Sequence, residues 1–441
     1  MPRLTSLLLA MSISTSALAQ MSSNGLDLDG PTQSLPANPT TPQDSTPRMT
    51  SDMVSANFYQ FMSDKAMQPV MASLMSDLHV RLNDYMQERD IPGMAFGFRM
   101  EDRIAGAISA GVGDRAARQL LAPKMPMHLG EVAMPFTATL VLQLVEQRRI
   151  ELDEPIRTYL TDVPWLERIP NHADITVRHL LSHTSGVPDF QSNDAFWAAL
   201  RENPRRSFTP EERMSYVFDS EAAFPPGKGW AMSTTNYILL GIILETKTNE
   251  PLFKRMRERV FERNELASTR GCANPRGGGI AVGLLSADNP TGQSGRNIRR
   301  GYWVINPQYA GAAEGILSNP IDLNKFWFNF CNGAIITRPT LEQAMKPDPA
   351  SISDEGGYGL GMMIRTSAFG TAYGHRGSFL GYRTVIAYYP DLNLSVSLQC
   401  NRPDAVSETE LQDLLDQLAA LAESYREPLK NAPNTLGPLK P

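Results

Sequence analysis

The chain has 441 residues, of which 42% are hydrophobic and 20% are charged. This composition is typical of a globular protein, and the length suits one large two-lobed domain or two ordinary ones. The formal net charge of −6 provides no basic surface for nucleic acid, so we expect no nucleic-acid partner. No apolar run after the first 19 residues approaches the roughly 20 residues that span a bilayer, so we expect no transmembrane segment in the mature protein.

Residues 1–19 have the pattern of a secretory signal peptide. Arg3 supplies a positive start, an apolar run follows, and Ala17 and Ala19 form an A-x-A cleavage site. Residues 20–52 are rich in Ser, Thr, Pro, Asn and Gln and contain few large apolar residues, which predicts a disordered linker. We therefore expect a periplasmic or secreted protein. The lack of a cysteine directly after the cleavage site argues against a lipid anchor.

The three cysteines are Cys272, Cys331 and Cys400. An oxidising compartment would permit one disulfide and leave one thiol, and the spacing leaves the pairing open. For each cysteine, the role of a small buried hydrophobic residue is favoured. The chain has no C-x-x-C grouping, and we expect neither a metal site nor another cofactor.

Residue periodicity predicts strands near both ends of the chain and helices between them. Strands are expected over 94–98, 104–112, 358–365, 383–389 and 394–400. Helices are expected over 71–89, 175–190 (ending in a turn), 193–221 (with breaks at Pro204 and Pro210), 237–245 and 252–266, and at the end of 314–330. An irregular segment is expected over 273–300. A capping box of Ser407 and Glu410 predicts the start of a last helix.

This order of elements predicts an α+β domain over residues 53–430. A mostly helical region of about residues 130–330 separates the N-terminal strands from the C-terminal strands, and residues 431–441 form a tail. Within that region, the stretch 130–153 is apolar on several faces, as is typical of a buried helix. The N-terminus of such a helix carries unpaired N–H groups and a partial positive charge, so it is a suitable position for catalytic residues.

The stretch 130–153 resembles the active-site helix of the serine β-lactamase and penicillin-binding-protein superfamily, most closely the class C branch. Members of that family read G-S-x-x-K-P-F-T-A at this point, and residues 135–138 match its last four letters. Glu131 stands where the nucleophilic Ser should be, and Met134 stands where the Lys should be. The resemblance implies a β-lactamase/transpeptidase-like fold, an antiparallel sheet flanked by helices.

The other two family motifs are Y-x-N (or S-x-N) and K-T-G (or H-x-G). Met232 replaces the Tyr of the second motif, and Thr234 replaces the Asn that holds the substrate amide in relatives. No Lys follows a Ser by three residues and no Tyr precedes an Asn by two, so the motifs have not moved elsewhere. A thioether has no usable basicity and cannot replace Lys or Tyr. The third motif is retained as His375, Arg376 and Gly377, followed by Ser378.

Two interpretations of Glu131 remain open. In the first, its carboxylate caps the helix and lies in or beside the oxyanion hole, which the backbone N–H groups at the positions of Glu131 and Ser378 form in relatives. His375 is then its nearest charged partner. In the second, Glu131 points to solvent at the start of a helix.

His183 lies in a second family-like phrase, over 175–190. A catalytic role is one interpretation. A cluster of Ser, Thr and His before Gly and Pro is also what a helix end and its turn require, and this structural role is favoured.

The loss of the reactive pair predicts an inactive pseudoenzyme that binds a peptidoglycan-like peptide, another small amide or a protein partner. The alternative is an active serine hydrolase (a β-lactamase, D-alanyl peptidase or esterase) with rearranged residues, for which Ser233 and Ser378 are the candidate nucleophiles. A carboxylate catalyst at Glu131 would need a second carboxylate, and none stands at a recognisable spacing. A structural remnant with no ligand is the third possibility.

Overall fold

The computed structural model of the protein describes residues 58–61, 68–101, 104–273 and 275–432. These residues belong to the compact unit Met49–Pro441. The predicted signal peptide (1–19), the predicted linker (20–52) and most of the predicted tail lie outside the described residues.

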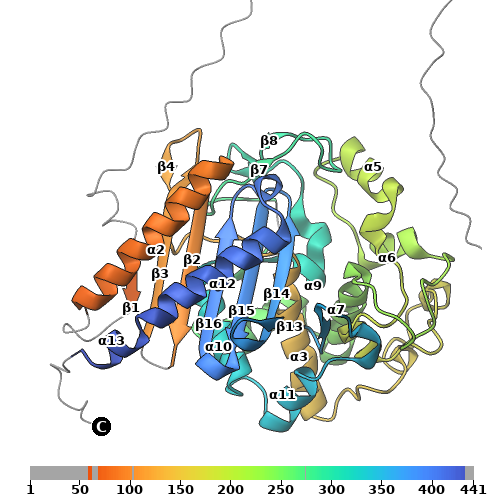
Figure 1. Cartoon of the computed structure of the whole chain (residues 1–441). Coiled ribbons are helices and arrows are strands. Elements are labelled where there is room, and N and C mark those ends of the chain that lie inside the picture. Colours follow the sequence, from red (N-terminus) through yellow and green to blue (C-terminus); the bar gives the residue numbers. More distant parts are fainter. Residues whose placement is uncertain (1–57, 62–67, 102–103, 274, 433–441) are drawn as a thin grey trace, which may run out of the picture. The chain divides into compact units, whose positions relative to one another are not determined.

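An antiparallel sheet forms the centre of this unit (Figure 1). Its strands follow the order β1-β3-β2-β16-β15-β14-β13-β12, and β4 pairs with β3. Because β2 pairs with β16, the two ends of the domain form one sheet, which confirms the predicted α+β class. The strands are β1 (Phe58–Phe61), β2 (Gly93–Met100), β3 (Ile104–Asp114), β4 (Gln119–Leu120), β12 (Gly356–Tyr358), β13 (Met363–Ser367), β14 (Gly370–Phe379), β15 (Tyr382–Tyr389) and β16 (Leu394–Cys400).

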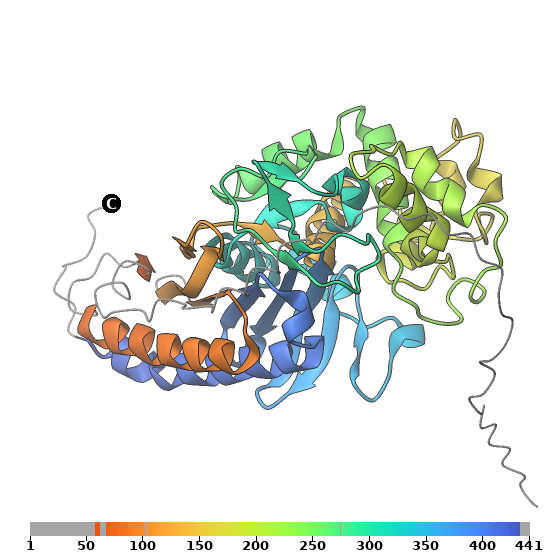
Figure 2. The same cartoon turned by 90° about the horizontal axis from the view of Figure 1, so that it is seen from above.

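Helices α2 (Gln68–Arg89) and α12 (Glu408–Ser424) lie side by side across one face of the sheet (Figures 1 and 2). The capping box of Ser407 and Glu410 begins α12, as the sequence predicts. Helix α10 (Pro320–Cys331) packs against the sheet through β2 and β16. The leucines that bury one side of α12 against the sheet are Leu411, Leu414, Leu415 and Leu418.

The predicted helical region supplies a second group of elements beside the sheet (Figure 2). Its helices are α3 (Met134–Glu146), α4 (Val177–Leu181), α5 (Asp194–Glu202), α6 (Pro210–Met214), α7 (Thr234–Thr248), α8 (Leu252–Met256) and α9 (Gly311–Glu314). Its short strands are β5 (Met127–His128), β6 (Arg270–Gly271), β7 (Leu284–Leu285), β8 (Gly295–Arg296), β9 (Ile298–Arg299), β10 (Tyr302–Trp303) and β11 (Ile316–Ser318). Two more helices, α11 (Arg338–Ala344) and α13 (Arg426–Lys430), lie outside that region.

One part of the sheet differs from the prediction made from the sequence. The single strand expected over 358–365 is wrong, because β12 ends at Tyr358 and β13 begins at Met363. Gly361, at φ 87°, lies in the break between them. Strand β14 was not expected at all, because its sequence, GTAYGHRGSF, is rich in glycine and does not alternate apolar with polar residues.

The central helix is shorter than the stretch 130–153. A 3-10 turn over Gly130–Ala133 leads into α3, which has Pro135 in its first turn. Phe136 stacks on Phe326 of α10 with ring centroids 3.8 Å apart, so the apolar faces of α3 are buried as predicted. The helix ends at Glu146, and Arg148 follows with a left-handed φ of 55°.

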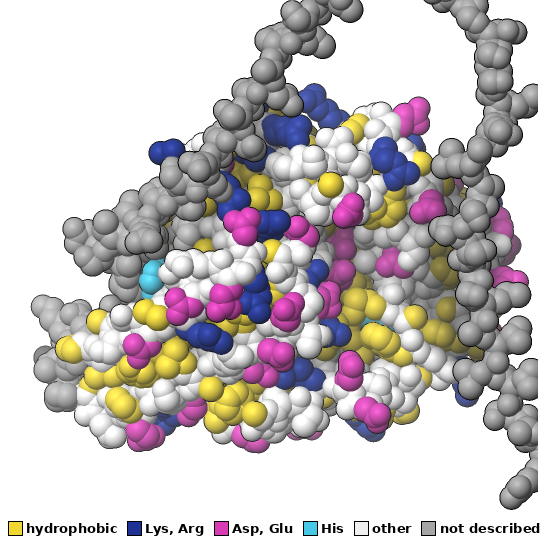
Figure 3. All heavy atoms as spheres, turned by 45° about the horizontal axis from the view of Figure 1, so that its top comes forward, with side chains coloured by type: hydrophobic (Ala, Val, Ile, Leu, Met, Phe, Trp, Pro, Cys, Tyr) yellow, Lys and Arg dark blue, Asp and Glu magenta, His cyan; other side chains and the backbone are white. Residues whose placement is uncertain are grey.

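All three cysteines are buried and free, so the structure contains no disulfide among Cys272, Cys331 and Cys400. Of the helices that the structure describes, none is long and apolar enough to cross a membrane. Acidic and basic side chains are mixed over the face shown in Figure 3, in keeping with the small net charge.

Candidate functional site

Two glycines bring the predicted motif positions together. The 3-10 turn before α3 packs directly against β14, the strand that carries the retained third motif. A Cβ added to Gly377 would lie 2.6 Å from the backbone nitrogen of Glu131. A Cβ added to Gly130, which has a φ of 57°, would lie 2.6 Å from the backbone nitrogen of Ser378. Only residues without a side chain permit this approach.

The carboxylate of Glu131 lies against the backbone of β14. The N–H of Ser378 donates to Oε2 of Glu131 at 2.8 Å. The N–H of Glu131 itself also lowers the pKa of this carboxylate. These are the two N–H groups that would form the oxyanion hole in relatives. The first interpretation of Glu131, a carboxylate in that hole, is therefore the one that the structure shows.

Burial raises the pKa of Glu131 to about 7, against the opposing effect of the two N–H groups. The nearby carboxylates of Glu408 and Asp189 raise the pKa further. Glu408 in turn forms an ion pair with Arg376, whose Nε lies 3.0 Å from its Oε2. Glu131 therefore titrates close to neutral pH.

Two further acids, Asp189 and Glu314, lie near enough to Glu131 for their charges to interact with it. Oδ1 of Asp189 accepts a hydrogen bond from the hydroxyl of Thr234 at 2.6 Å, and its Oδ2 accepts one from the Thr234 N–H at 3.1 Å. Gln191 donates to Oε2 of Glu314 at 2.9 Å and to Thr234 at 3.3 Å. Burial raises the pKa of both Asp189 and Glu314, and the charge of Glu131 raises that of Glu314 again.

These contacts join Thr234 of the second motif to the acids by a chain of hydrogen bonds. A second carboxylate, Glu314, therefore does lie near Glu131, although nothing in the sequence spacing indicated it. We call Glu131, Asp189 and Glu314 the acidic cleft group.

Met134 is fully buried at the position where relatives place Lys. The hydroxyl of Tyr358 lies 4.0 Å from its sulfur and also donates to Nε2 of His375 at 2.8 Å. The ring of His183 packs edge-on against Tyr358, with centroids 4.9 Å apart. This surrounding is aromatic and neutral, so it offers no base where the family uses one.

The expected pairing of His375 with Glu131 is wrong. Nδ1 of His375 lies 2.8 Å from the carbonyl oxygen of Arg376, which can only accept, so Nδ1 carries the hydrogen and Nε2 accepts from Tyr358. Burial lowers the pKa of His375 to about 4, so the ring is neutral at pH 7. Both ring nitrogens are engaged elsewhere, and the neutral ring cannot balance the charge of Glu131.

The remaining motif positions carry no base and no serine hydroxyl that is hydrogen-bonded to one. Met232 is half-buried just before α7. Ser233 is buried, and its hydroxyl has no hydrogen-bond partner among the described residues. The hydroxyl of Ser378 accepts from Nε of Arg383 at 2.9 Å. Neither of these two serine hydroxyls, proposed as alternative nucleophiles, is hydrogen-bonded to a base in the described structure.

His183 has a structural position at the end of α4. It is fully buried with a left-handed φ of 60°, and Nδ1 accepts from the N–H of Ser233 at 3.2 Å. Burial lowers its pKa to about 3, so the ring is neutral. His179 lies four residues earlier, but the described part of the chain contains no group of three or more His, Cys, Asp or Glu side chains arranged to hold a metal.

Sequence reasoning missed Asp189, Gln191, Glu314 and Tyr358. Asp189 closes the family-like phrase over 175–190 and could have been noticed there. Glu314 and Tyr358 lie far along the chain from α3 and have no motif around them, so only the fold brings them to the site.

A family model described as Beta-lactamase matches residues 80–421, so the chain belongs to the β-lactamase family. Penicillin-binding protein 4* of Bacillus subtilis (strain 168) is 22% identical over 294 residues, which cover 64% of this chain and 62% of that protein. D-aminopeptidase of Brucella anthropi is 22% identical over 324 residues, which cover 72% of this chain and 57% of that protein. The chain thus matches less than two thirds of the length of these two relatives.

Solved structures show the same fold. A D-stereospecific amidohydrolase from Streptomyces aligns with a TM-score of 0.66 and 24% identity, over 76% of this chain and 98% of that one. The D-amino acid amidase from Ochrobactrum anthropi SV3, complexed with D-phenylalanine, aligns with a TM-score of 0.65 and 22% identity, over 82% of this chain and 100% of that one.

The arrangement is poorly suited to acyl transfer. That chemistry requires a nucleophile, a base that takes its proton, and free N–H donors for the developing oxyanion. Here the nucleophile position carries a carboxylate, the neighbouring thioether of Met134 is no base, and the Glu131 carboxylate already accepts from one of the two N–H donors, that of Ser378.

Proposed function

We propose that this chain is an exported, catalytically inactive member of the β-lactamase family that binds a small peptide or amide in its cleft. The observation that carries the proposal is the 2.8 Å hydrogen bond from the Ser378 N–H to the carboxylate of Glu131. A substrate carbonyl oxygen would need that same N–H group. The site thus keeps the family scaffold while its own side chain takes the place of the reacting atom.

The charge of the cleft favours a ligand that carries an ammonium group. The acidic cleft group provides three carboxyl groups, and both Glu131 and Asp189 are partly exposed. The two histidines near it are neutral, so no charged imidazole offsets these acids. A free ammonium group would hydrogen-bond to these carboxyl groups and favour their ionised form, and an amide N–H would make a weaker contact of the same kind.

Two comparisons favour the same ligand class. One solved relative is a D-amino acid amidase complexed with D-phenylalanine, and another relative is a D-aminopeptidase. We therefore propose an amino acid amide or a short peptide with a free amino terminus. A peptidoglycan-like peptide with a free amine belongs to this class.

Calorimetric titration with D-phenylalaninamide, paired with an ammonia-release assay, tests this proposal. We expect saturable binding without release of ammonia, and weaker binding of N-acetyl-D-phenylalaninamide, which lacks the ammonium group. Asp189→Asn should weaken binding, whereas Asp194→Asn, an exposed acid on α5, should not. Ammonia release, or equal binding of the acetylated amide, would contradict the proposal.

The export part of the proposal rests on the signal-like pattern over 1–19. Expression of the full chain in a bacterium with a periplasm, followed by N-terminal sequencing of the protein released by osmotic shock, tests it. We expect a mature protein that begins at Gln20. A protein that retains Met1 and stays with the cytoplasmic fraction would contradict export.

A further inference from the structure

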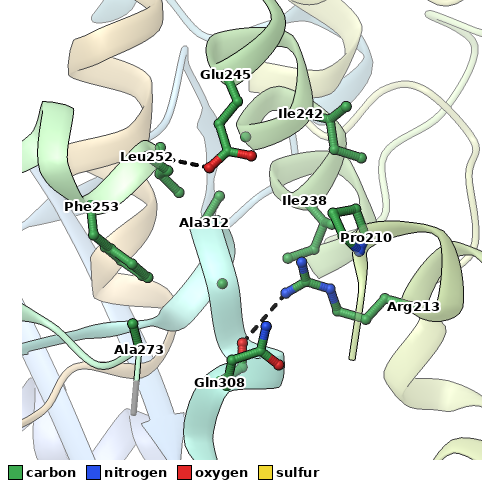
Figure 4. Close-up of a pocket in the computed structure, with 12 residues that line it drawn as sticks. Pro210, Arg213, Ile238, Ile242, Glu245, Leu252, Phe253, Ala273, Gln308 and Ala312 are labelled. Carbon is green, nitrogen blue, oxygen red and sulfur yellow. Dashed lines mark hydrogen bonds between the residues drawn. The ribbon is translucent and has the colours of Figure 1, made fainter. Parts of the chain in front are cut away.

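A pocket of about 290 Å³ lies in the helical region, and none of the acidic cleft group lines it (Figure 4). Side chains from four helices form its walls. They include Arg213 of α6, Ile238, Ile242 and Glu245 of α7, Phe253 of α8 and Ala312 of α9. Its volume is near the lower end of ligand pockets, which hold roughly 300–1,000 Å³.

Arg213 brings a positive charge to this pocket without a matching ion pair. The residue is 6% exposed, and its Nη1 donates to the carbonyl oxygen of Tyr309 at 3.1 Å. Its Nε is buried and has no hydrogen-bond partner among the described residues. Burial lowers the pKa of Arg213 to about 10, so the guanidinium is still protonated at pH 7. A buried cation without a counter-ion is costly, and an anion in the pocket would relieve that cost.

Glu245 lies across the same pocket (Figure 4). Its Oε1 accepts from the N–H of Leu252 at 2.8 Å, which fixes the carboxylate at the start of α8. Its charge raises the pKa of Arg213, yet no ion pair joins these two side chains in the described structure. Two opposite charges therefore face one cavity without meeting. Ile238, Ile242 and Phe253 provide the apolar surface between them.

We propose that this pocket binds a small amino acid with an apolar side chain. Its carboxylate would bind the guanidinium of Arg213, its ammonium group the carboxylate of Glu245, and its side chain would pack against Ile242 and Phe253. A zwitterion of this kind satisfies both charges at once, which neither a simple anion nor a simple cation does. The proposal is independent of the function proposed for the cleft.

Calorimetric titration of the full chain with leucine, as each enantiomer, tests the proposal. Two leucine analogues serve as probes, 4-methylpentanoate without the amine and 3-methylbutylamine without the carboxylate. We expect at least one leucine enantiomer to bind saturably, and both analogues to bind about tenfold more weakly or worse. Failure of both leucine enantiomers to bind, or equal binding of an analogue, would overturn the proposal.

Variants of residues that line the pocket test whether leucine binds there. Arg213→Gln and Glu245→Gln should each weaken leucine binding about tenfold or more, whereas the exposed controls Arg205→Gln and Glu221→Gln should not. Ile242→Trp keeps both charges and fills the pocket, so it should abolish binding even if Arg213→Gln fails to fold. Binding that survives Ile242→Trp would overturn the assignment.

Discussion

The backbone N–H of Ser378 donates to the side-chain carboxylate of Glu131 at 2.8 Å, across 247 residues of sequence. Gly130 and Gly377 make this contact possible, because a Cβ on either would lie 2.6 Å from a backbone nitrogen of the other segment. The family scaffold thus holds its two oxyanion donors in place, and the side chain of Glu131 accepts a hydrogen bond from one of them. Our proposal of an inactive site with intact architecture rests on this one relationship.

The pKa of Glu131, raised from 4.5 to about 7, makes stability depend on pH. The folded state binds a proton more tightly than the unfolded state, so Glu131 lowers the free energy of unfolding as the pH rises from about 4.5 to about 7. The full effect is at most about 3 kcal/mol. We expect Glu131→Gln to be stabilised relative to wild type at about pH 7.5 and less so at about pH 5.

Urea unfolding of both proteins at the two pH values measures this difference. The charge of Glu131 also raises the pKa of Glu314, so the pH-dependent difference between the two proteins reports Glu131 together with this coupling. A difference between the variants that does not change with pH would contradict the raised pKa.

Because β14 closely approaches the turn before α3, we predict that alanine destabilises the fold at Gly377 but not at Gly278. In Gly377→Ala, the new Cβ must displace the backbone at Glu131, and we expect a loss of more than about 2 kcal/mol. Gly278→Ala is the matched control, because a Cβ there meets nothing within 4 Å. Thermal unfolding should give a much lower Tm for the first variant and a Tm near wild type for the second. Similar Tm values for both would contradict the packing described.

Tyr358 satisfies the buried Nε2 of His375, so its hydroxyl should stabilise the fold. Tyr358→Phe leaves that nitrogen without a donor, and we expect a loss of about 1–3 kcal/mol in the free energy of unfolding. Tyr302→Phe is the control, because Tyr302 is 47% exposed. If urea unfolding gives both variants the stability of wild type, His375 does not depend on the Tyr358 hydroxyl.

The cysteines predict a simple thiol count. Burial raises the pKa of Cys272 to about 12 and that of Cys400 to about 11, and it raises the pKa of Cys331 well above its usual value. Buried, protonated thiols react slowly. We expect the native protein to react with almost no Ellman's reagent and the denatured, unreduced protein to show three thiols. A count of one thiol after denaturation would reveal a disulfide.

The sequence predicted the sheet where strands alternate and helices where apolar residues recur. It placed β15 and β16 to within one residue, and it identified the capping box of α12. It missed β14, because glycines that serve close packing remove the alternation that marks a strand.

Within the site, the sequence located Glu131, Met134, Thr234 and His375, because each stands at a fixed place in a motif. The sequence did not predict which residues contact these four side chains. Whether His375 faces Glu131 or Tyr358 depends on a carbonyl acceptor at Arg376 and on the position of β12. Neither can be predicted from the sequence. Long-range contacts of this kind come from the fold.

The most direct test of the central claim is intact mass spectrometry of the mature protein after incubation with a fluorescent penicillin and, separately, with a fluorophosphonate. Both probes react with the activated serine of an active family member. We predict an unchanged mass with each probe, because the described site has no activated serine and the Glu131 carboxylate occupies the Ser378 N–H donor that an acyl oxygen would need. A stoichiometric adduct, mapped by peptide sequencing to Ser233, Ser378 or any other residue, would contradict the account.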